Sequence, residues 1–460
     1  MKKLALALAV LGSVISGSLT ASAYDDRRDH DWNDDYWHHH HYGYWHGERG
    51  YWRYHDHGHE FIRVGPDLGG LRTRLASKGI TFNLQYAAEV WGNPTGGDSS
   101  GTVYTGLMTL QANVDLQKLV GWQGGSVSTR WYWLSGQDIS AEHVGNIFTV
   151  SNIAGFPTLR SNELWFQQNF LNNRISISVG ELAADSQFDL STYSAVFLNG
   201  TFSWSPYLYT NIPNGGPGYP MGAPGVQVVL TPLNWLTYQG AVFQGNVFAQ
   251  DVNRHGFRWD LNASNGYFSI HELILRTNQG STVSGLPGEF KIGGWFDTVP
   301  DPNVASSQPW NYGLYFIADQ MLYRVPRPDS TSVLRNNSKQ TTVASGTDEG
   351  LGIFTHIGFG PQSSSLINFY FDGGLNYKGI IPTRNNDVLG VAFAYGHLSN
   401  NPQDNEGSST PGYEIVLEAT YQMELTQSLT LQPDLQYVIH PSGTNIANAL
   451  VLGAQATVSF

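Results

Sequence analysis

From residue 81 to the last residue, polar and apolar side chains alternate with a period of two in many short segments. Within residues 105–116, Met108, Leu110 and Val114 share one side and Gln111 shares the other. Successive side chains of a strand point to opposite faces, so each segment predicts a β-strand with one apolar and one polar face. An apolar face toward lipid and a polar face toward water are typical of a closed transmembrane barrel.

The composition supports this interpretation. Charged residues make up 13% of the chain, about half of the usual 25% of a globular protein, whereas aromatic residues reach 13%. The chain has no cysteine, which excludes a disulfide framework, a thiolate nucleophile and a zinc–thiolate site. The net charge of −13 makes nucleic acid an unfavourable partner.

The alternating segments number about sixteen, and bacterial barrels have an even number of antiparallel strands. They span residues 80–91, 103–117, 125–135, 160–170, 173–182, 224–231, 235–246, 265–276, 288–298, 311–324, 349–359, 365–378, 387–398, 411–423, 427–440 and 448–460. The sequence therefore predicts an all-β protein, a closed antiparallel transmembrane β-barrel of about 16 strands with a short N-terminal helix and a disordered His-rich N-terminal extension.

The connections between these segments alternate between short and long, as expected for periplasmic turns and external loops. The loop at 183–223 is the longest external one, and we expect it to fold inward and narrow the pore. Residues 325–348 break the pattern, because they would form an unusually long periplasmic turn, and the strand register near them is open.

The N-terminal region divides into three parts before the barrel at 80–460. Residues 1–23 have a basic start, an apolar run and an Ala-Ser-Ala end, which predict a secretory signal peptide. Residues 24–64 form an extension rich in His, Asp, Tyr and Trp that has too few aliphatic residues to build a core. Residues 65–79 predict a short periplasmic helix that ends at Gly79.

The His-rich extension allows two interpretations. Neutral imidazoles such as those of His38, His39, His40 and His41 can bind transition metals, and a flexible tract without fixed geometry would bind them weakly. The alternative is a disordered extension without a ligand. The histidines outside this tract show no ligand spacing.

The chain ends on Phe460, which closes an alternating segment. A C-terminal aromatic residue in this position is similar to the signal read by the outer-membrane barrel insertion machinery. Barrel insertion machinery and outer-membrane lipid are therefore expected partners.

The stretches LGGLRTRLASKGITF, NELWFQQNF, VGELAADSQFD, NYGLYFIADQMLYR, DGGLNYKGIIPTRNNDVLGVAFAY and LQPDLQYVIHPSGTNIANALVLGAQATVSF resemble the OprB family of carbohydrate-selective porins. The resemblance runs from about residue 65 to Phe460. It implies a single-chain barrel of sixteen strands in the outer membrane of a Gram-negative bacterium, which passes glucose and other small sugars by passive diffusion without a cofactor. A monomer and a trimer are both compatible with it, and the His-rich extension lies outside the family pattern.

Sugar selection in a pore requires aromatic faces and hydrogen-bonding groups on inward positions. The alternation directs inward Arg130 and Tyr132 on one segment and Glu163, Trp165 and Gln167 on the next. Arg160 precedes Glu163 by three residues and could join an Arg/Glu cluster, and Glu181 and Asp185 open the long loop. A charged pair across the lumen favours dipolar solutes. The alternative is that these charges only brace the barrel wall or the loop.

Three other functions remain open from sequence. A general, non-selective porin would have the same strand pattern. An outer-membrane barrel enzyme would need a nucleophile and a partnered base, and the sequence has neither a G-x-S-x-G motif nor a compelling Ser/His pair. A secreted soluble β-protein, such as a lectin or a glycoside hydrolase, would bury the apolar faces that a barrel turns to lipid, and Glu163 with Glu181 could serve as its carboxylate pair.

Overall fold

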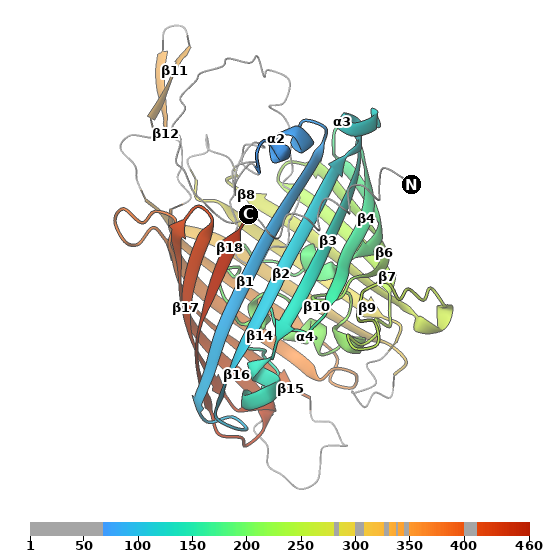
Figure 1. The fold of residues 1–460 in the computed structure, drawn as a ribbon, viewed down its shortest axis with the longest axis vertical. Helices are drawn as coiled ribbons and strands as arrows, with labels where there is room; N and C mark the ends of the chain where they lie inside the picture. The colour runs from blue at the N-terminus through green and yellow to red at the C-terminus, as the bar shows by residue number, and fades with distance from the viewer. Residues whose placement is uncertain are drawn as a thin grey trace. The chain divides into compact units, whose positions relative to one another are not determined.

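The computed structural model shows sixteen antiparallel strands that close into one barrel (Figure 1). The structure describes residues 68–279, 285–299, 308–325, 331–336, 339–344, 349–399 and 412–460. The predicted signal peptide, the extension at 24–64 with His38 to His41, and the first residues of the predicted helix at 65–79 lie outside these ranges. The predicted closed antiparallel β-barrel and its number of strands are confirmed.

The barrel strands agree with the predicted segments to within a few residues at each end. They are β1 (Ile80–Thr95), β2 (Gly101–Asp115), β3 (Gly125–Gly136), β4 (Leu159–Phe170), β5 (Ile175–Leu182), β6 (Ala223–Leu233), β7 (Leu236–Gln244), β8 (Tyr267–Thr277), β9 (Gly288–Asp297), β10 (Asn311–Arg324), β13 (Gly350–Phe359), β14 (Ile367–Lys378), β15 (Val388–Leu398), β16 (Tyr413–Thr426), β17 (Leu429–Ile439) and β18 (Ala449–Ser459).

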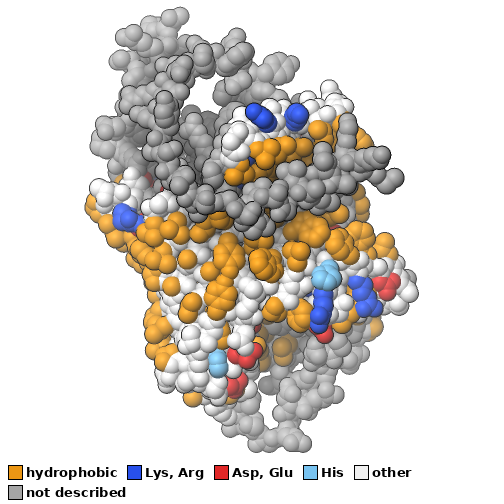
Figure 2. Space-filling model, viewed as in Figure 1, with side chains coloured by type: hydrophobic (Ala, Val, Ile, Leu, Met, Phe, Trp, Pro, Cys, Tyr) orange, Lys and Arg blue, Asp and Glu red, His pale blue; other side chains and the backbone are white. Residues whose placement is uncertain are grey.

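The two faces of the wall follow the sequence alternation. On β10, Leu314 is 63% exposed and Tyr312 48%, whereas Tyr315, Ile317 and Asp319 on the other face are at most 2% exposed. Figure 2 shows hydrophobic side chains spread over the outer surface of the barrel. Lipid therefore meets the apolar face and the lumen receives the polar one, as a transmembrane barrel requires.

The first strand pairs with the last and closes the barrel. β1 and β18 are antiparallel, with Tyr86 opposite Val458. The backbone N–H of Phe460 donates to the Leu84 carbonyl at 2.9 Å, so the predicted C-terminal signal residue lies at this seam. The strand order is otherwise sequential, except that β10 pairs with β13.

Residues 331–344 explain the long connection that the sequence left open. β11 (Thr331–Asn336) and β12 (Lys339–Ala344) pair only with each other, as a separate two-stranded hairpin. β10 therefore pairs directly with β13, and their register begins with Leu314 opposite Phe359. The hairpin is not part of the barrel order, which stays at sixteen strands.

The helices are short. α2 (Leu71–Ala76) precedes β1, and α4 (Pro206–Tyr209) lies in the loop between β5 and β6. α3 (Leu116–Val120) follows β2 and is capped by Asp115, whose carboxylate accepts hydrogen bonds from the backbone N–H groups of Gln117 and Lys118 at 2.9 and 3.1 Å. None of the helices in the described part of the chain is long and apolar enough to cross a membrane.

Candidate functional site

The loop at 183–222, which we call the inner loop, folds into the barrel as predicted. Its apolar side chains Phe188, Phe197, Phe202 and Leu208 are at most 2% exposed and belong to one hydrophobic cluster with wall residues such as Phe354. Exposure of one such side chain to water, as on an external loop, would cost about 1.5–3 kcal/mol of free energy relative to burial. Burial of these side chains holds the inner loop in the lumen.

Glycines on the inner face of the wall make room for loop aromatics. A Cβ built on Gly352 would lie 2.2 Å from the ring of Tyr193, and one built on Gly390 would lie 2.9 Å from the ring of Phe197. Gly396 stands in the same way beneath Phe148, which belongs to the external loop at 137–158. Each ring rests against bare backbone, so these loops approach the wall more closely than any other residue type would allow.

Carboxylates of the wall accept hydrogen bonds from the loops. Asp319 on β10 accepts from the Ser191 hydroxyl at 2.5 Å and from the Thr192 N–H at 2.8 Å. Glu418 on β16 accepts from the Leu198 N–H at 2.7 Å and from the Asn199 N–H at 3.1 Å.

The same pattern recurs elsewhere on the wall. Glu414 accepts from the N–H groups of Ile147 and Phe148 at 2.9 and 2.7 Å, and Lys291 donates to the Leu190 carbonyl at 2.7 Å. Buried backbone N–H and C=O groups need hydrogen-bond partners. The loops lie inside the barrel without a neighbouring strand, so these charged side chains act as the partners.

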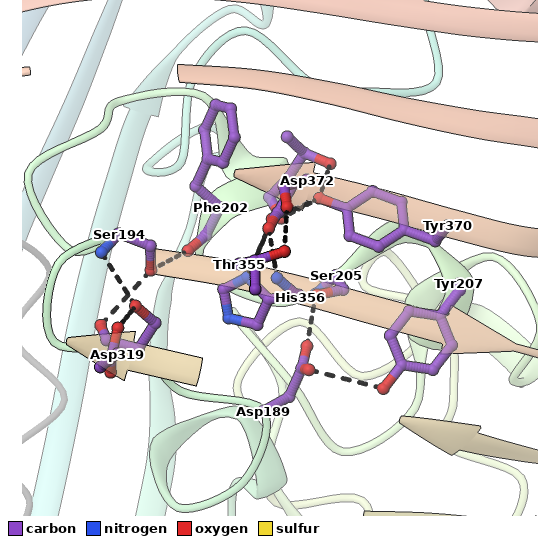
Figure 3. Close-up of polar contacts among 12 residues, drawn as sticks. Asp189, Ser194, Phe202, Ser205, Tyr207, Asp319, Thr355, His356, Tyr370 and Asp372 are labelled. Carbon is purple, nitrogen blue, oxygen red and sulfur yellow. Dashed lines mark hydrogen bonds and ion pairs between the residues drawn. The ribbon is translucent and has the colours of Figure 1, made fainter. Parts of the chain in front are cut away.

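A polar cluster joins the inner loop to β13 and β14 (Figure 3). His356 Nδ1 lies 2.8 and 2.9 Å from the two oxygens of Asp372, which also accepts from the Tyr370 hydroxyl at 2.8 Å. Opposite them, Asp189 of the inner loop accepts from the Ser205 N–H at 2.9 Å. Burial raises the pKa of Asp189 to about 6, although the nearby His356 and the hydrogen bonds from Ser205 lower it in part.

The hydrogen bonds given above for the inner loop join it to β9 through Lys291, to β10 through Asp319 and to β16 through Glu418. Gln432 extends this set to β17, since its amide donates to the Val196 carbonyl at 2.6 Å. In the barrel order, β13 and β3 lie half a circuit apart. These hydrogen bonds fasten the inner loop to the half of the wall that faces β1 to β4, and separate contacts described below join it to β3 and β4.

Arg130 on β3 and Glu163 on β4 are paired in register and form an ion pair, with Nη1 and Oε2 3.1 Å apart. Their side chains are 3% and 4% exposed. The other carboxylate oxygen of Glu163 accepts from the Ser186 hydroxyl at 2.6 Å. The pair predicted from the alternation is therefore present, and it also meets the start of the inner loop.

Three more predicted residues have inward positions. Trp165 is partly exposed and packs against the hydrophobic cluster of the inner loop. Gln167 accepts from the Ser178 hydroxyl at 3.1 Å. Tyr132 is buried, and its ring lies 5.3 Å from that of Tyr219 in the inner loop.

The other three predicted residues hold loops in place. The guanidinium of Arg160 does not join the Arg130 pair but donates to carbonyls of the external loop at 245–266, at 2.9 Å for Gln250 and Asn253. A bulge at this point of β4 places Arg160 opposite Tyr132, on the same inward face as Glu163. Glu181 accepts from the Ser161 hydroxyl at 2.9 Å, and Asp185 accepts from the Tyr219 N–H at 2.8 Å.

The wall residues that hold the loops were not predicted from the sequence. Lys291, Asp319 and Glu418 each occupy an inward position in an alternating segment, and a charged residue at such a position was the available signal. The described residues contain no group of three or more His, Asp or Glu side chains placed to hold a metal ion. The His-rich extension lies outside the residues to which this applies.

The architecture and the sequence both match known porins. The family model of the carbohydrate-selective porins, OprB family, matches residues 100–460. The chain belongs to this family. It is 24% identical to Porin B of Pseudomonas aeruginosa over 441 residues, which cover 86% of this chain and 90% of that protein.

Solved structures show the same fold. A high-pH structure of Pseudomonas putida OprB superposes with a TM-score of 0.69 at 23% identity, covering 86% of this chain and 97% of that one. A low-pH structure of the same protein gives a TM-score of 0.53 at 21% identity, with 86% and 98% covered. The protein is an outer-membrane carbohydrate-selective porin of a Gram-negative bacterium, and family and fold indicate a channel.

Proposed function

We propose that the path between the inner loop and the wall of β1 to β4 selects small neutral sugars, glucose among them, and passes them by passive diffusion without a cofactor. The observation that carries this proposal is the division of the lumen. Hydrogen bonds from β9, β10, β16 and β17 fasten the inner loop to the far half of the wall. Arg130, Glu163 and the partly exposed Trp165 occupy the near half, which the loop also meets through Ser186 and Tyr219.

Each group has a separate role in this proposal. The Arg130–Glu163 pair is nearly enclosed, so it acts as a fixed dipole at the wall and favours solutes rich in hydroxyl groups over apolar ones. The Trp165 ring offers a face to the apolar side of a pyranose. Inward amides such as Gln167 exchange hydrogen bonds with hydroxyls. These contacts bind a sugar weakly enough for it to enter and leave the pore, as conduction requires.

Swelling of liposomes that contain the refolded protein tests the proposal. Sugars of increasing size are compared with neutral non-sugar solutes of the same size. Faster swelling with monosaccharides than with the matched solutes is expected. Equal rates would show a general porin instead.

An enzymatic function is the second candidate, and one contact could favour it. Ser99 Oγ lies 2.8 Å from His143 Nδ1 in the external loops. An acyl-transfer site also needs an acidic group to orient the histidine, and in the described contacts this ring nitrogen is already used by the serine. We propose that the protein is a channel and not an enzyme. Lipid or peptide hydrolysis by the purified protein would contradict this.

A further inference from the structure

The external loop at 245–266 completes the barrel wall at one point of its rim. β4 begins at Leu159, but its pairing with β5 begins only at Leu164, because the chain after β5 turns inward. The loop fills the free edge: the Ser161 N–H donates to the His255 carbonyl at 3.0 Å, and the His255 ring bonds the Leu159 carbonyl at 2.9 Å. The Arg160 contacts described above fix the same segment from within.

The outer side of this loop is apolar and exposed. Phe257 packs against Trp131, whose ring belongs to the outward face of β3, with ring centroids 5.5 Å apart. Phe257 is 51% exposed, Trp259 49% and Leu261 79%. Trp133, next along the outward face of β3, is 52% exposed. Aromatic side chains at the end of a barrel strand mark the membrane–water interface, so this surface lies at the level of the lipid head groups.

Two exposed arginines belong to the same loop. Arg254 lies over the Phe156 ring at 5.1 Å and Arg258 over the Phe248 ring at 4.3 Å, and both are exposed. In the described contacts neither guanidinium forms an ion pair with a carboxylate, although Asp251 is near in sequence: Arg254 Nε donates to its backbone carbonyl at 3.3 Å. Figure 1 shows this loop, in yellow-green, projecting at the right, and Figure 2 shows basic and acidic side chains beside hydrophobic ones on that side.

We propose that this surface binds the phosphate groups of lipid A, the phosphorylated glycolipid of the outer leaflet. The stacked guanidinium groups present planar donors that match a phosphate. The exposed side chains of Phe257 and Leu261 enter the adjacent acyl region of the lipid. Their transfer out of water favours binding and breaks no contact within the protein. The proposal depends on the location of the protein in the outer membrane and not on its sugar preference.

The test is retention of fluorescent lipid A by the full-length protein in mixed detergent micelles. The double variant R254Q/R258Q is compared with the parent, and R174Q is the matched control, since Arg174 is an exposed arginine at the opposite end of the barrel. Each arginine near an anionic lipid surface contributes about 1 kcal/mol, so the double variant should bind lipid A about 30-fold more weakly. R174Q should bind like the parent.

Two changes of ligand test whether the arginines bind the lipid phosphates. Lipid A without its phosphates should bind the parent and the double variant equally, and excess inorganic phosphate should not displace the intact lipid. Liposome swelling with sugars should be the same for the double variant, which also shows that it folds. Equal lipid A retention by parent and double variant, or an equal loss with R174Q, would overturn the proposal.

Discussion

The ring of Tyr207 in the inner loop rests on the backbone of Gly358 in β13, where an added Cβ would lie 2.5 Å from the ring. Gly358→Val should therefore push the inner loop off the wall, at a cost of about 1–3 kcal/mol for the overpacked site. The strand itself favours valine, so the barrel should still form. Single-channel conductance should rise and sugar preference should fall.

Gly373→Ala on β14 is the control for this variant, because an added Cβ there would first meet the backbone oxygen of Phe354, at 3.3 Å, which belongs to the wall rather than the loop. It should conduct like the parent. Parental conductance and sugar preference in folded Gly358→Val would show that the Tyr207 contact does not position the loop.

The Arg130–Glu163 pair is best tested by removing both partners, because removal of one leaves a buried charge without its counterpart. Arg130→Ala plus Glu163→Ala should leave folding intact and reduce the ratio of sugar to salt flux by about threefold, equivalent to about 0.7 kcal/mol. Swelling assays with glucose and a salt of similar size measure this ratio. An unchanged ratio in the folded double variant would reject the pair as a filter.

The barrel could be predicted from the sequence because each strand is marked by a pattern of neighbouring residues. Alternation along each strand indicated the strand positions and the inward register of Arg130, Glu163 and Trp165. Their pairing across β3 and β4 followed from the sequential order of strands in a meander.

The position of the inner loop could not be derived in the same way. Its contacts with β10, β16 and β17 join residues more than a hundred positions apart, such as Thr192 with Asp319, and no periodicity records such pairs. The bulge in β4 is a second example: it places Arg160 on the inward face with Glu163, although the two are three residues apart, and period-two reasoning has no signal for one extra residue in a strand.

Asp189 predicts how the inner loop responds to pH. Its pKa is raised from the usual value near 4 to about 6, so the docked loop binds this proton more tightly than the free loop does. The resulting stabilisation is complete below about pH 4 and is lost as pH rises through 6, with a limit of about 3 kcal/mol. Asp189→Asn should remove this dependence, and asparagine suits the left-handed backbone at this position, where φ is 57°.

Hydrogen–deuterium exchange of inner-loop peptides measures this effect, after correction for the intrinsic rate and relative to strand peptides. Exchange of the parent should accelerate between pH 4.5 and 7, while Asp189→Asn should stay protected across this range. Asp251→Asn, an exposed position in another loop, serves as the control and should behave as the parent does. The same acceleration in Asp189→Asn would assign the pH response to other groups.

Arg72 on α2 links the start of the barrel to its last residue. Its guanidinium donates to the terminal carbonyl of Phe460 and lies 4.9 Å from the centre of the Phe82 ring. Arg72→Ala should therefore weaken the seam between β1 and β18 by about 1.5–3 kcal/mol, the usual contribution of a hydrogen bond to a charged group. The temperature at which the barrel loses its compact gel mobility should fall. Arg74→Ala on the same helix, where the side chain is exposed, should leave that temperature unchanged, and an equal fall in both variants would assign the effect to α2 as a whole.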